Sequence, residues 1–345
     1  MYTSLPILPM KKVSITTNTV NPRRKFNILP GLLEVPTEHE TRFFQIIFDN
    51  YSLTNIHFRL IPVYTLYMLL RHRLSPFGKV NLSSIQKQEN VLDLIYRIEN
   101  LIHKKIEECL GHVSYLAYWL ANISELVHFL KQDRDLSKIS SDIQFRLINH
   151  LHKIYSYLLN LLQNELDKHL INFINPRDIP FSNDNLQSTE IRWTTTIDHH
   201  NHSDILSLLS SIVDLFRKCR VNPGLTIEIF SQLFHYINTW LFNRIVCYPE
   251  LKLCSHYWGE KLSLRLKSIQ NWAYQQGLEL PSEYHLTKIN QLCSLLTNEK
   301  RDLYDVQQLV SNKSFQINSI QINEILNNYI LDKNEPSIMR NFSQA

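Results

Sequence analysis

Apolar residues recur at helical spacing along most of this chain, and this periodicity constrains the fold more than any other feature. Between Val113 and Lys131, and again between Leu225 and Val246, they fall three or four positions apart. Residues at this spacing share one face of an α-helix. Further apolar residues cover a second side of both segments, so we predict two central helices. The residues expected in the core are Trp119, Asn122, Phe230, Phe234, Trp240 and Trp258.

Several predicted helices carry their own start signals. Ser83 begins a Ser-x-x-Gln capping box, and Ser141 begins another, in which each side chain satisfies a backbone donor of the first turn. Asn222 followed by Pro223 is typical of an N-cap and a first helical residue. The whole chain has only 6 glycines, which favours helices over folds built from tight turns.

These patterns predict an all-α fold. A chain of 345 residues exceeds the size at which one hydrophobic core usually keeps growing, so we expect two helical halves. The predicted parts are, in chain order, a disordered N-terminal lead (1–34), a first half (about 35–176), a polar linker (177–202), a second half (203–331) and a flexible tail (332–345).

The lead contains a basic cluster, Arg23, Arg24 and Lys25, among prolines and polar residues. Such a composition buries little apolar surface. We interpret the cluster as part of a solvated tail; contact with acidic lipid or with a partner is the alternative.

Charge and cysteine content narrow the function classes. The net charge is only +4, and the basic residues are mixed with acidic ones, which does not indicate a nucleic-acid partner. The 5 cysteines are an odd number at irregular spacings, which predicts a reduced, cytosolic setting. The longest apolar runs, such as Val63–Leu70, are far shorter than the roughly 20 residues that span a bilayer, so we predict no transmembrane segment.

One short segment has the residue types of a zinc site: Asp198, His199, His200, His202 and Asp204. Adjacent histidines in a polar linker seldom converge on one ion without a distant ligand. We therefore interpret the segment as a solvated loop and predict no metal.

Cys254 near His256 raises the alternatives of a metal site or a thiol nucleophile with its base. No C-x-x-C pair surrounds it, and a buried thiol beside Trp258 is the preferred interpretation. The sequence also lacks the Walker, GxGxxG, HExxH and GxSxG motifs. We predict that the protein is not an enzyme and needs no cofactor.

Two further polar features lie beside the predicted core. Asn122, Asn238 and Asn243 sit within apolar runs, where a buried amide must find hydrogen-bond partners. We expect interhelical or helix-to-loop bonds that fix packing, with direct partner contact as the alternative.

The other feature is the charged connection that follows the first central helix. It has two interpretations: a local clasp, in which Asp side chains accept backbone N–H groups and Arg134 pairs with a carboxylate, or a partner-facing patch. We favour the clasp. The residues of this candidate site are Lys131, Gln132, Asp133, Arg134 and Asp135.

Five stretches of the chain resemble dilute-domain sequence: residues 58–68, 118–126, 130–137, 230–244 and 253–259. The resemblance is to the afadin family, ahead of the Ras-associating dilute-domain proteins and of class V myosin tails. Gln-Asp-Arg-Asp at 132–135 and Cys-Ser-His-Tyr-Trp-Gly at 254–259 carry this preference.

The resemblance implies an all-α, elongated tandem helical bundle of about ten helices. It also implies a non-enzymatic scaffold module that docks junctional or cytoskeletal adaptor proteins. It implies a cytoplasmic location at adherens junctions, where such proteins link cell adhesion to the actin cytoskeleton. The GTPase, nectin and actin contacts of the full-length family would lie outside this chain. The alternative is a cargo-adaptor or small-GTPase-effector module, as in class V myosin tails or Ras-associating dilute-domain proteins.

Overall fold

The structure is a computed structural model, and it describes residues 31–49, 59–78, 81–174, 198–298 and 315–331. Within these ranges the chain forms twelve α-helices, two short 3-10 helices and no β-strand. The prediction of an all-α fold is confirmed. Most of the predicted lead and polar linker, and the flexible tail, lie outside the described residues.

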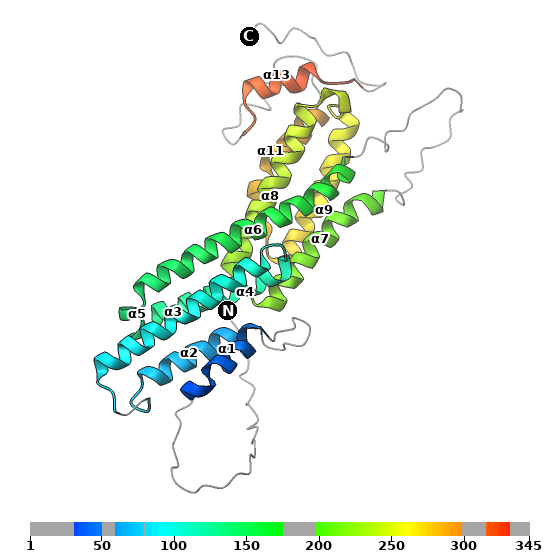
Figure 1. The fold of residues 1–345 in the computed structure, drawn as a ribbon. Helices are drawn as coiled ribbons and strands as arrows, with labels where there is room; N and C mark the ends of the chain where they lie inside the picture. The colour runs from blue at the N-terminus through cyan, green and yellow to red at the C-terminus, as the bar shows by residue number, and fades with distance from the viewer. Residues whose placement is uncertain (1–30, 50–58, 79–80, 175–197, 299–314, 332–345) are drawn as a thin grey trace, which may run out of the picture.

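The described part of the first half contains six helices, and the longest of them is α6 (Figure 1). A short helix not expected from the sequence, α1, begins this half. The helices are α1 (Glu40–Phe48), α2 (Ile61–Leu74), α3 (Ser84–Cys109), α4 (Val113–Gln132), α5 (Leu136–Ile139) and α6 (Ser141–Phe173).

The described part of the second half contains six further helices. Helix α7 starts at Asp198, so the helical period that is visible from Ile205 extends back into the segment predicted to be a loop. The helices are α7 (Asp198–Cys219), α8 (Pro223–Val246), α9 (His256–Gln276), α10 (Glu279–His285), α11 (Thr287–Thr297) and α13 (Ser319–Asn327).

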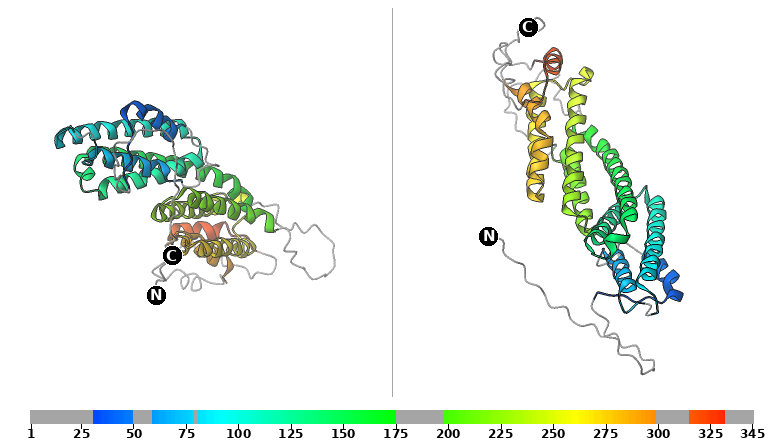
Figure 2. Two further views of the ribbon diagram at one scale, coloured as in Figure 1. Left: turned by 90° about the horizontal axis from the view of Figure 1, so that it is seen from below. Right: turned by 90° about the vertical axis from the view of Figure 1, so that its left-hand side faces the viewer.

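Helix α6 joins the two halves. Its 33 residues correspond to about 50 Å at a rise of about 1.5 Å per residue. It packs against α3 and α4 in the first half and against α7 and α8 in the second. Viewed from further sides, the halves lie end to end in an elongated molecule (Figure 2).

Polar contacts with α6 hold the halves together. The Tyr236 hydroxyl of α8 donates a hydrogen bond of 2.6 Å to Asp167 of α6. Arg265 of α9, only 3% exposed, donates to the carbonyl oxygen of Phe173 in the last turn of α6. Terminal carbonyls of a helix lack an intrahelical partner, so Arg265 satisfies one of them inside the core.

The two predicted central helices lie in the core. Trp119 of α4 is 1% exposed and stacks on Phe48 of α1 with ring centroids 5.5 Å apart. In the second half, Phe230 and Phe234 of α8 are fully buried, and Trp258 of α9 is 3% exposed.

The expectation for Trp240 needs correction, because its side chain is only partly buried. The indole packs against the core, and the guanidinium carbon of Arg244 lies 5.9 Å from the ring centroid. The apolar stripe of α8 is wider than the surface that its neighbours cover, and Trp240 lies at the edge of that stripe.

In each central helix, a buried asparagine side chain forms a hydrogen bond with a backbone N–H group at the start of a neighbouring helix. Asn122 of α4 accepts from the Val63 N–H at 3.4 Å in the first turn of α2 and donates to the Arg59 carbonyl at 3.0 Å. Asn238 of α8 accepts from the Ile289 N–H at 2.8 Å in the first turn of α11. Both amides thus satisfy backbone donors that a helix start leaves open, as expected.

Two other expectations about polar residues were wrong. Asn243 is exposed and does not belong to the buried amides. Helix α6 is not started by a capping box at Ser141, because Ser140 is the N-cap residue and its hydroxyl donates to the Leu136 carbonyl of α5 at 2.7 Å. The capping box at Ser83 and the Asn222 cap are present as predicted.

A glycine sets the distance between α9 and α11. A Cβ atom added at Gly259 would lie 2.7 Å from the Cβ of Leu296 and 2.9 Å from the Cγ2 of Thr297. Real Cβ atoms do not approach each other so closely, so only glycine permits this helix contact.

Candidate functional site

The charged connection between α4 and α5 is organised around one carboxylate. Asp133 accepts hydrogen bonds from the backbone N–H groups of Asp135 and Leu136, both at 3.0 Å. Its other oxygen accepts from the Tyr67 hydroxyl of α2 at 2.9 Å and lies 3.5 Å from a guanidinium nitrogen of Arg71. The side chain of Asp133 is only 9% exposed, so a single buried carboxylate joins this connection to α2.

These contacts perturb the titration of Asp133. Burial alone raises its pKa, but hydrogen bonds from the Leu136 N–H, the Tyr67 hydroxyl and the Asp135 N–H, together with Arg71, lower it more. The net pKa is below the ordinary value, so the carboxylate is charged at neutral pH. Burial, followed by the interaction with Asp133, raises the pKa of Tyr67, while Arg71 opposes this shift.

The other residues of the candidate site have different surroundings. Lys131, Gln132, Arg134 and Asp135 are exposed. Among the ion pairs of the described residues none involves Arg134, and the cation beside Asp133 is Arg71, from a distant part of the sequence. The expected pairing of Arg134 with a carboxylate is therefore corrected. A partner-facing role for the exposed members stays a prediction.

Aromatic rings continue from Asp133 along α2 and α4. Tyr67 stacks on Phe129 with centroids 4.6 Å apart, and Tyr64 meets the same Phe129 edge to face at 5.0 Å. We call Tyr64, Tyr67 and Phe129 the aromatic strip. Tyr64 is 38% exposed, and Arg71, with its guanidinium carbon 5.9 Å from the Tyr67 centroid, is exposed at the end of the strip. Tyrosine and arginine are the residue types enriched where proteins bind one another.

A hollow of about 500 Å³ lies beyond Arg71, at the C-terminal end of α2. Its apolar part is formed by Leu32, Leu74, Pro76 and Phe77, of which Phe77 is 47% exposed. Its charged rim is formed by Arg71, Asp133 and Asp135. The candidate connection, the aromatic strip and this hollow therefore make one continuous surface, which we call the α2 surface. Sequence reasoning identified only the connection, because the strip and the hollow need α2 beside α4.

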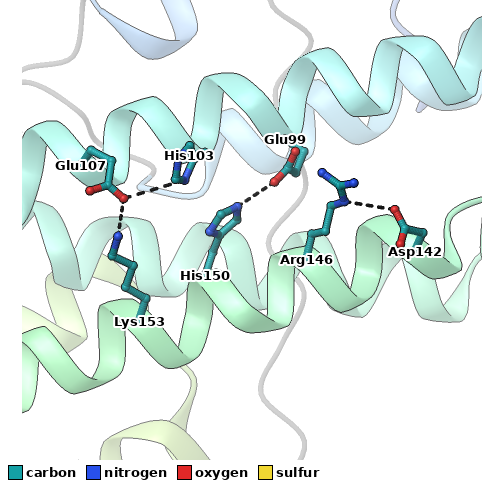
Figure 3. Close-up of polar contacts among 7 residues, drawn as sticks. All are labelled: Glu99, His103, Glu107, Asp142, Arg146, His150 and Lys153. Carbon is teal, nitrogen blue, oxygen red and sulfur yellow. Dashed lines mark hydrogen bonds and ion pairs between the residues drawn. The ribbon is translucent and has the colours of Figure 1, made fainter.

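A second polar group lies between α3 and α6 (Figure 3). His150 of α6 contacts Glu99 of α3 at 2.8 Å, with side chains 13% and 6% exposed. The ring of His103 stacks on that of His150 at 5.2 Å, and Lys153 pairs with Glu107, whose pKa this hydrogen bond lowers. These side chains bind one another across two packed helices, so the group is a helix-to-helix contact.

Three buried thiols, those of Cys219, Cys254 and Cys293, are not poised for nucleophilic chemistry. Burial raises the pKa of Cys254 to about 12, and the Cys254 thiol donates to the Ile245 carbonyl at 3.5 Å. Burial likewise raises the pKa of Cys293 to about 12 and that of Cys219 to about 11. A thiol with such a pKa carries almost no thiolate at neutral pH.

Metal ligands do not gather in the described part of the chain: it contains no group of three or more His, Cys, Asp or Glu side chains arranged to hold an ion. The backbone at Asp198, His199, His200 and His202 is helical, which corrects the expected loop, while the placement of these side chains falls outside the description. Across the described ranges, no helix combines the length and apolar character needed to span a bilayer.

Comparison with known proteins finds a family match in the second half. Residues 228–333 match the model of the DIL domain family. Human unconventional myosin-Va is 21% identical to 94% of this chain, which spans 18% of that protein. The human Ras-associating and dilute domain-containing protein is 19% identical to 63% of the chain, over 22% of its own length. The chain thus corresponds to about a fifth of these relatives.

Solved structures show the same fold. Myo2-GTD in complex with Smy1 has a TM-score of 0.61 at 17% identity, covering 87% of this chain and 78% of that one. The yeast myosin 5 cargo binding domain has a TM-score of 0.60, with the same identity and coverage. Myo2-GTD in complex with Mmr1 has a TM-score of 0.57 and covers 85% of this chain and 72% of that one. These likenesses show that the chain shares its all-α fold with the solved domains.

Proposed function

We propose that this chain is a non-catalytic adaptor module that docks other proteins through the α2 surface. The observation that carries this proposal is an exposed aromatic and arginine surface on a fold shared with cargo-binding domains over 87% of the chain. Such a surface gives a partner rigid apolar area together with oriented charge, which is how a few residues supply most of the affinity of an interface.

More specifically, we propose that this module belongs to an afadin-type scaffold on the cytoplasmic side of adherens junctions, where it helps to link adhesion to the actin cytoskeleton. Its support is the sequence resemblance at 132–135 and 254–259. The first of these stretches contains Asp133 and thus lies in the α2 surface. Junctional or cytoskeletal adaptors are the proposed partners.

A cargo adaptor is the second candidate. Its support is the likeness to Myo2-GTD, which has been solved in complexes with Smy1 and Mmr1, and the match to myosin-Va over nearly the whole chain. In this case the module would bind a cargo receptor on a moving organelle.

Localisation in cultured epithelial cells separates the two candidates. The fluorescently tagged chain is expected to concentrate at cell–cell contacts if it is a junction scaffold, and on motile vesicles if it is a cargo adaptor. A chain that stays diffuse in both the cytoplasm and the nucleus contradicts the adaptor proposal.

A matched pair of tyrosine variants tests the surface itself. Tyr64 is 38% exposed in the aromatic strip, and Tyr157 is 42% exposed on α6. We expect Tyr64→Ala to abolish the localisation and Tyr157→Ala to preserve it, at equal thermal stability. Equal localisation of both variants would show that partners bind elsewhere.

A further inference from the structure

Exposed apolar side chains gather in one short part of the second half. Among the described residues, the four largest exposed fractions of big apolar side chains are 77% at Ile320, 73% at Tyr274, 72% at Tyr284 and 71% at Leu280. Three of these four lie between residues 274 and 284, in the last turn of α9 and in α10. Single exposed apolar residues are ordinary on a protein surface, whereas a group of them marks a place where another molecule binds.

The fold anchors one side of α10 and leaves the other side open. Leu278 and Leu286, which flank the helix, and Ser282 in its middle are buried, and α10 packs against α8 and α9. Leu280 and Tyr284 are four residues apart, so they are neighbours on the opposite face. The two apolar side chains therefore stand on a helix whose position is already fixed by the core.

This open side also carries uncompensated negative charge. Glu279 and Glu283 are four residues apart on α10, a spacing at which like charges repel. Within the described residues, neither carboxylate forms an ion pair or a side-chain hydrogen bond. Burial, followed by neighbouring His235, lowers the pKa of His285, so this imidazole is neutral at pH 7. A cation beside the two carboxylates would relieve their repulsion.

We propose that this side of α10 docks a basic amphipathic segment of another protein. We call Glu279, Leu280, Glu283 and Tyr284 the α10 face. The apolar side chains of the partner cover Leu280 and Tyr284, and its Lys or Arg side chains pair with the two carboxylates. An anionic membrane or a nucleic acid would meet these carboxylates with like charge, and so would the same face of a second copy, so charge complementarity selects a cationic protein segment.

The α10 face and the α2 surface are built from different helices. Helix α2 belongs to the first half of the molecule, while α8 and α9, which hold α10, belong to the second (Figure 1). A module with both surfaces can hold two partners. The inference goes beyond the proposed function and does not depend on it.

A synthetic peptide serves as the probe. A fluorescein-labelled helix of leucine and lysine, with its leucines on one face, is titrated with the full chain and followed by fluorescence anisotropy. We expect saturable binding, and binding at least about tenfold weaker for a peptide in which glutamate replaces every lysine. Equal binding of the two peptides overturns the pairing of cations with the α10 face.

Matched variants place the bound peptide. The double variant Leu280→Ala with Tyr284→Ala is expected to raise the Kd at least about tenfold, whereas Leu264→Ala, which removes a side chain 64% exposed on α9, leaves it unchanged. Glu283→Lys is expected to raise the Kd about two- to fivefold, the range for exposed ion pairs, and the exposed control Glu260→Lys leaves it unchanged. All these side chains are exposed, so the variants should melt with wild type. An unchanged Kd in the double variant overturns the proposal.

Three further measurements separate the other occupants. Light scattering should show a monomer; a dimer that the double variant dissociates means that a second copy covers the α10 face, and overturns the proposal. Flotation with phosphatidylserine vesicles should leave the chain unbound, and vesicle binding that the double variant loses overturns the proposal in favour of a membrane. Tyr64→Ala should bind the leucine–lysine peptide as wild type does. Loss of binding in that variant shows that the peptide occupies the α2 surface instead.

Discussion

The Asp133 carboxylate allows a prediction with a magnitude drawn from its contacts. Asp133→Ala removes the acceptor for two partly buried donors, the Leu136 N–H and the Tyr67 hydroxyl. Each such loss costs about 1 kcal/mol or more, and the pair with the half-exposed Arg71 adds less than about 1 kcal/mol. We expect the free energy of unfolding to fall by about 2–3 kcal/mol. Asp133→Asn, which keeps one acceptor oxygen, should lose about 1 kcal/mol.

Urea denaturation followed by circular dichroism measures these changes, and Arg134→Ala is the matched control. Arg134 is exposed and forms no ion pair within the described residues, so its removal should change stability by no more than about 0.5 kcal/mol. Hydrogen exchange adds a local readout, since the amide of Leu136 should exchange faster in Asp133→Ala than in Arg134→Ala.

The pH dependence gives an internal check. The folded pKa of Asp133 is lowered, so its ionic contribution is complete above the unfolded value of about 3.9 and is lost as the pH falls through the folded pKa. The gap between wild type and Asp133→Ala should therefore shrink below about pH 4. Wild-type stability and unchanged exchange in Asp133→Ala would refute the reasoning. An equal cost for Arg134→Ala would show that the local pair, and not Arg71, holds the connection.

Three further predictions concern the core and its histidines. Trp119→Ala should lower the free energy of unfolding by about 3–5 kcal/mol, and Trp240→Ala should lower it by clearly less, because the Trp240 indole is only partly buried. Equal losses of the two variants in urea denaturation would contradict this difference. Gly259→Ala should cost about 1–3 kcal/mol by forcing α9 from α11, and an unchanged melting temperature would show that the helices adjust freely. Burial lowers the pKa of His72 and, together with neighbouring His235, that of His285. The contribution of these two histidines to the free energy of unfolding is present above the unfolded pKa of about 6.5 and is lost as the pH falls through the lower folded values. The melting temperature of His72→Asn should therefore depend less on pH between pH 7.5 and pH 5 than that of wild type. A dependence as steep as that of wild type would count against this prediction.

The helices themselves were predictable because their signals are local. The Ser83 capping box lies within a few residues of the helix that it starts, and the stripes of α4 and α8 report a 3.6-residue period directly. The Ser141 signal failed because a neighbouring helix, α5, engages the adjacent Ser140 hydroxyl. Helix α1 was missed, and there the stabilising contacts are distant: Glu40 accepts from Arg73 at 2.7 Å and from Arg97 at 2.9 Å.

In the candidate site, too, the local contacts were predictable and the distant ones were not. Its sequence indicated a carboxylate that satisfies backbone N–H groups, and Asp133 does so within its own connection. The cation was expected nearby at Arg134, but it is Arg71, which is brought to Asp133 by the packing of α2 against α4. The hollow was not foreseeable, since Leu32 and Phe77 meet Asp135 only after α2 has docked.

By itself, the sequence determined that this protein is a set of amphipathic helices with buried amides in its central pair, because periodicity and capping depend on residues a few positions apart. Only the tertiary structure decided which backbone donors those amides satisfy, as Asn122 does for Val63 and Asn238 for Ile289. These partners lie 59 and 51 residues away along the chain. Hydrogen bonds and ion pairs act over a few ångströms of space, so their partners follow from packing and leave no pattern in the order of residues.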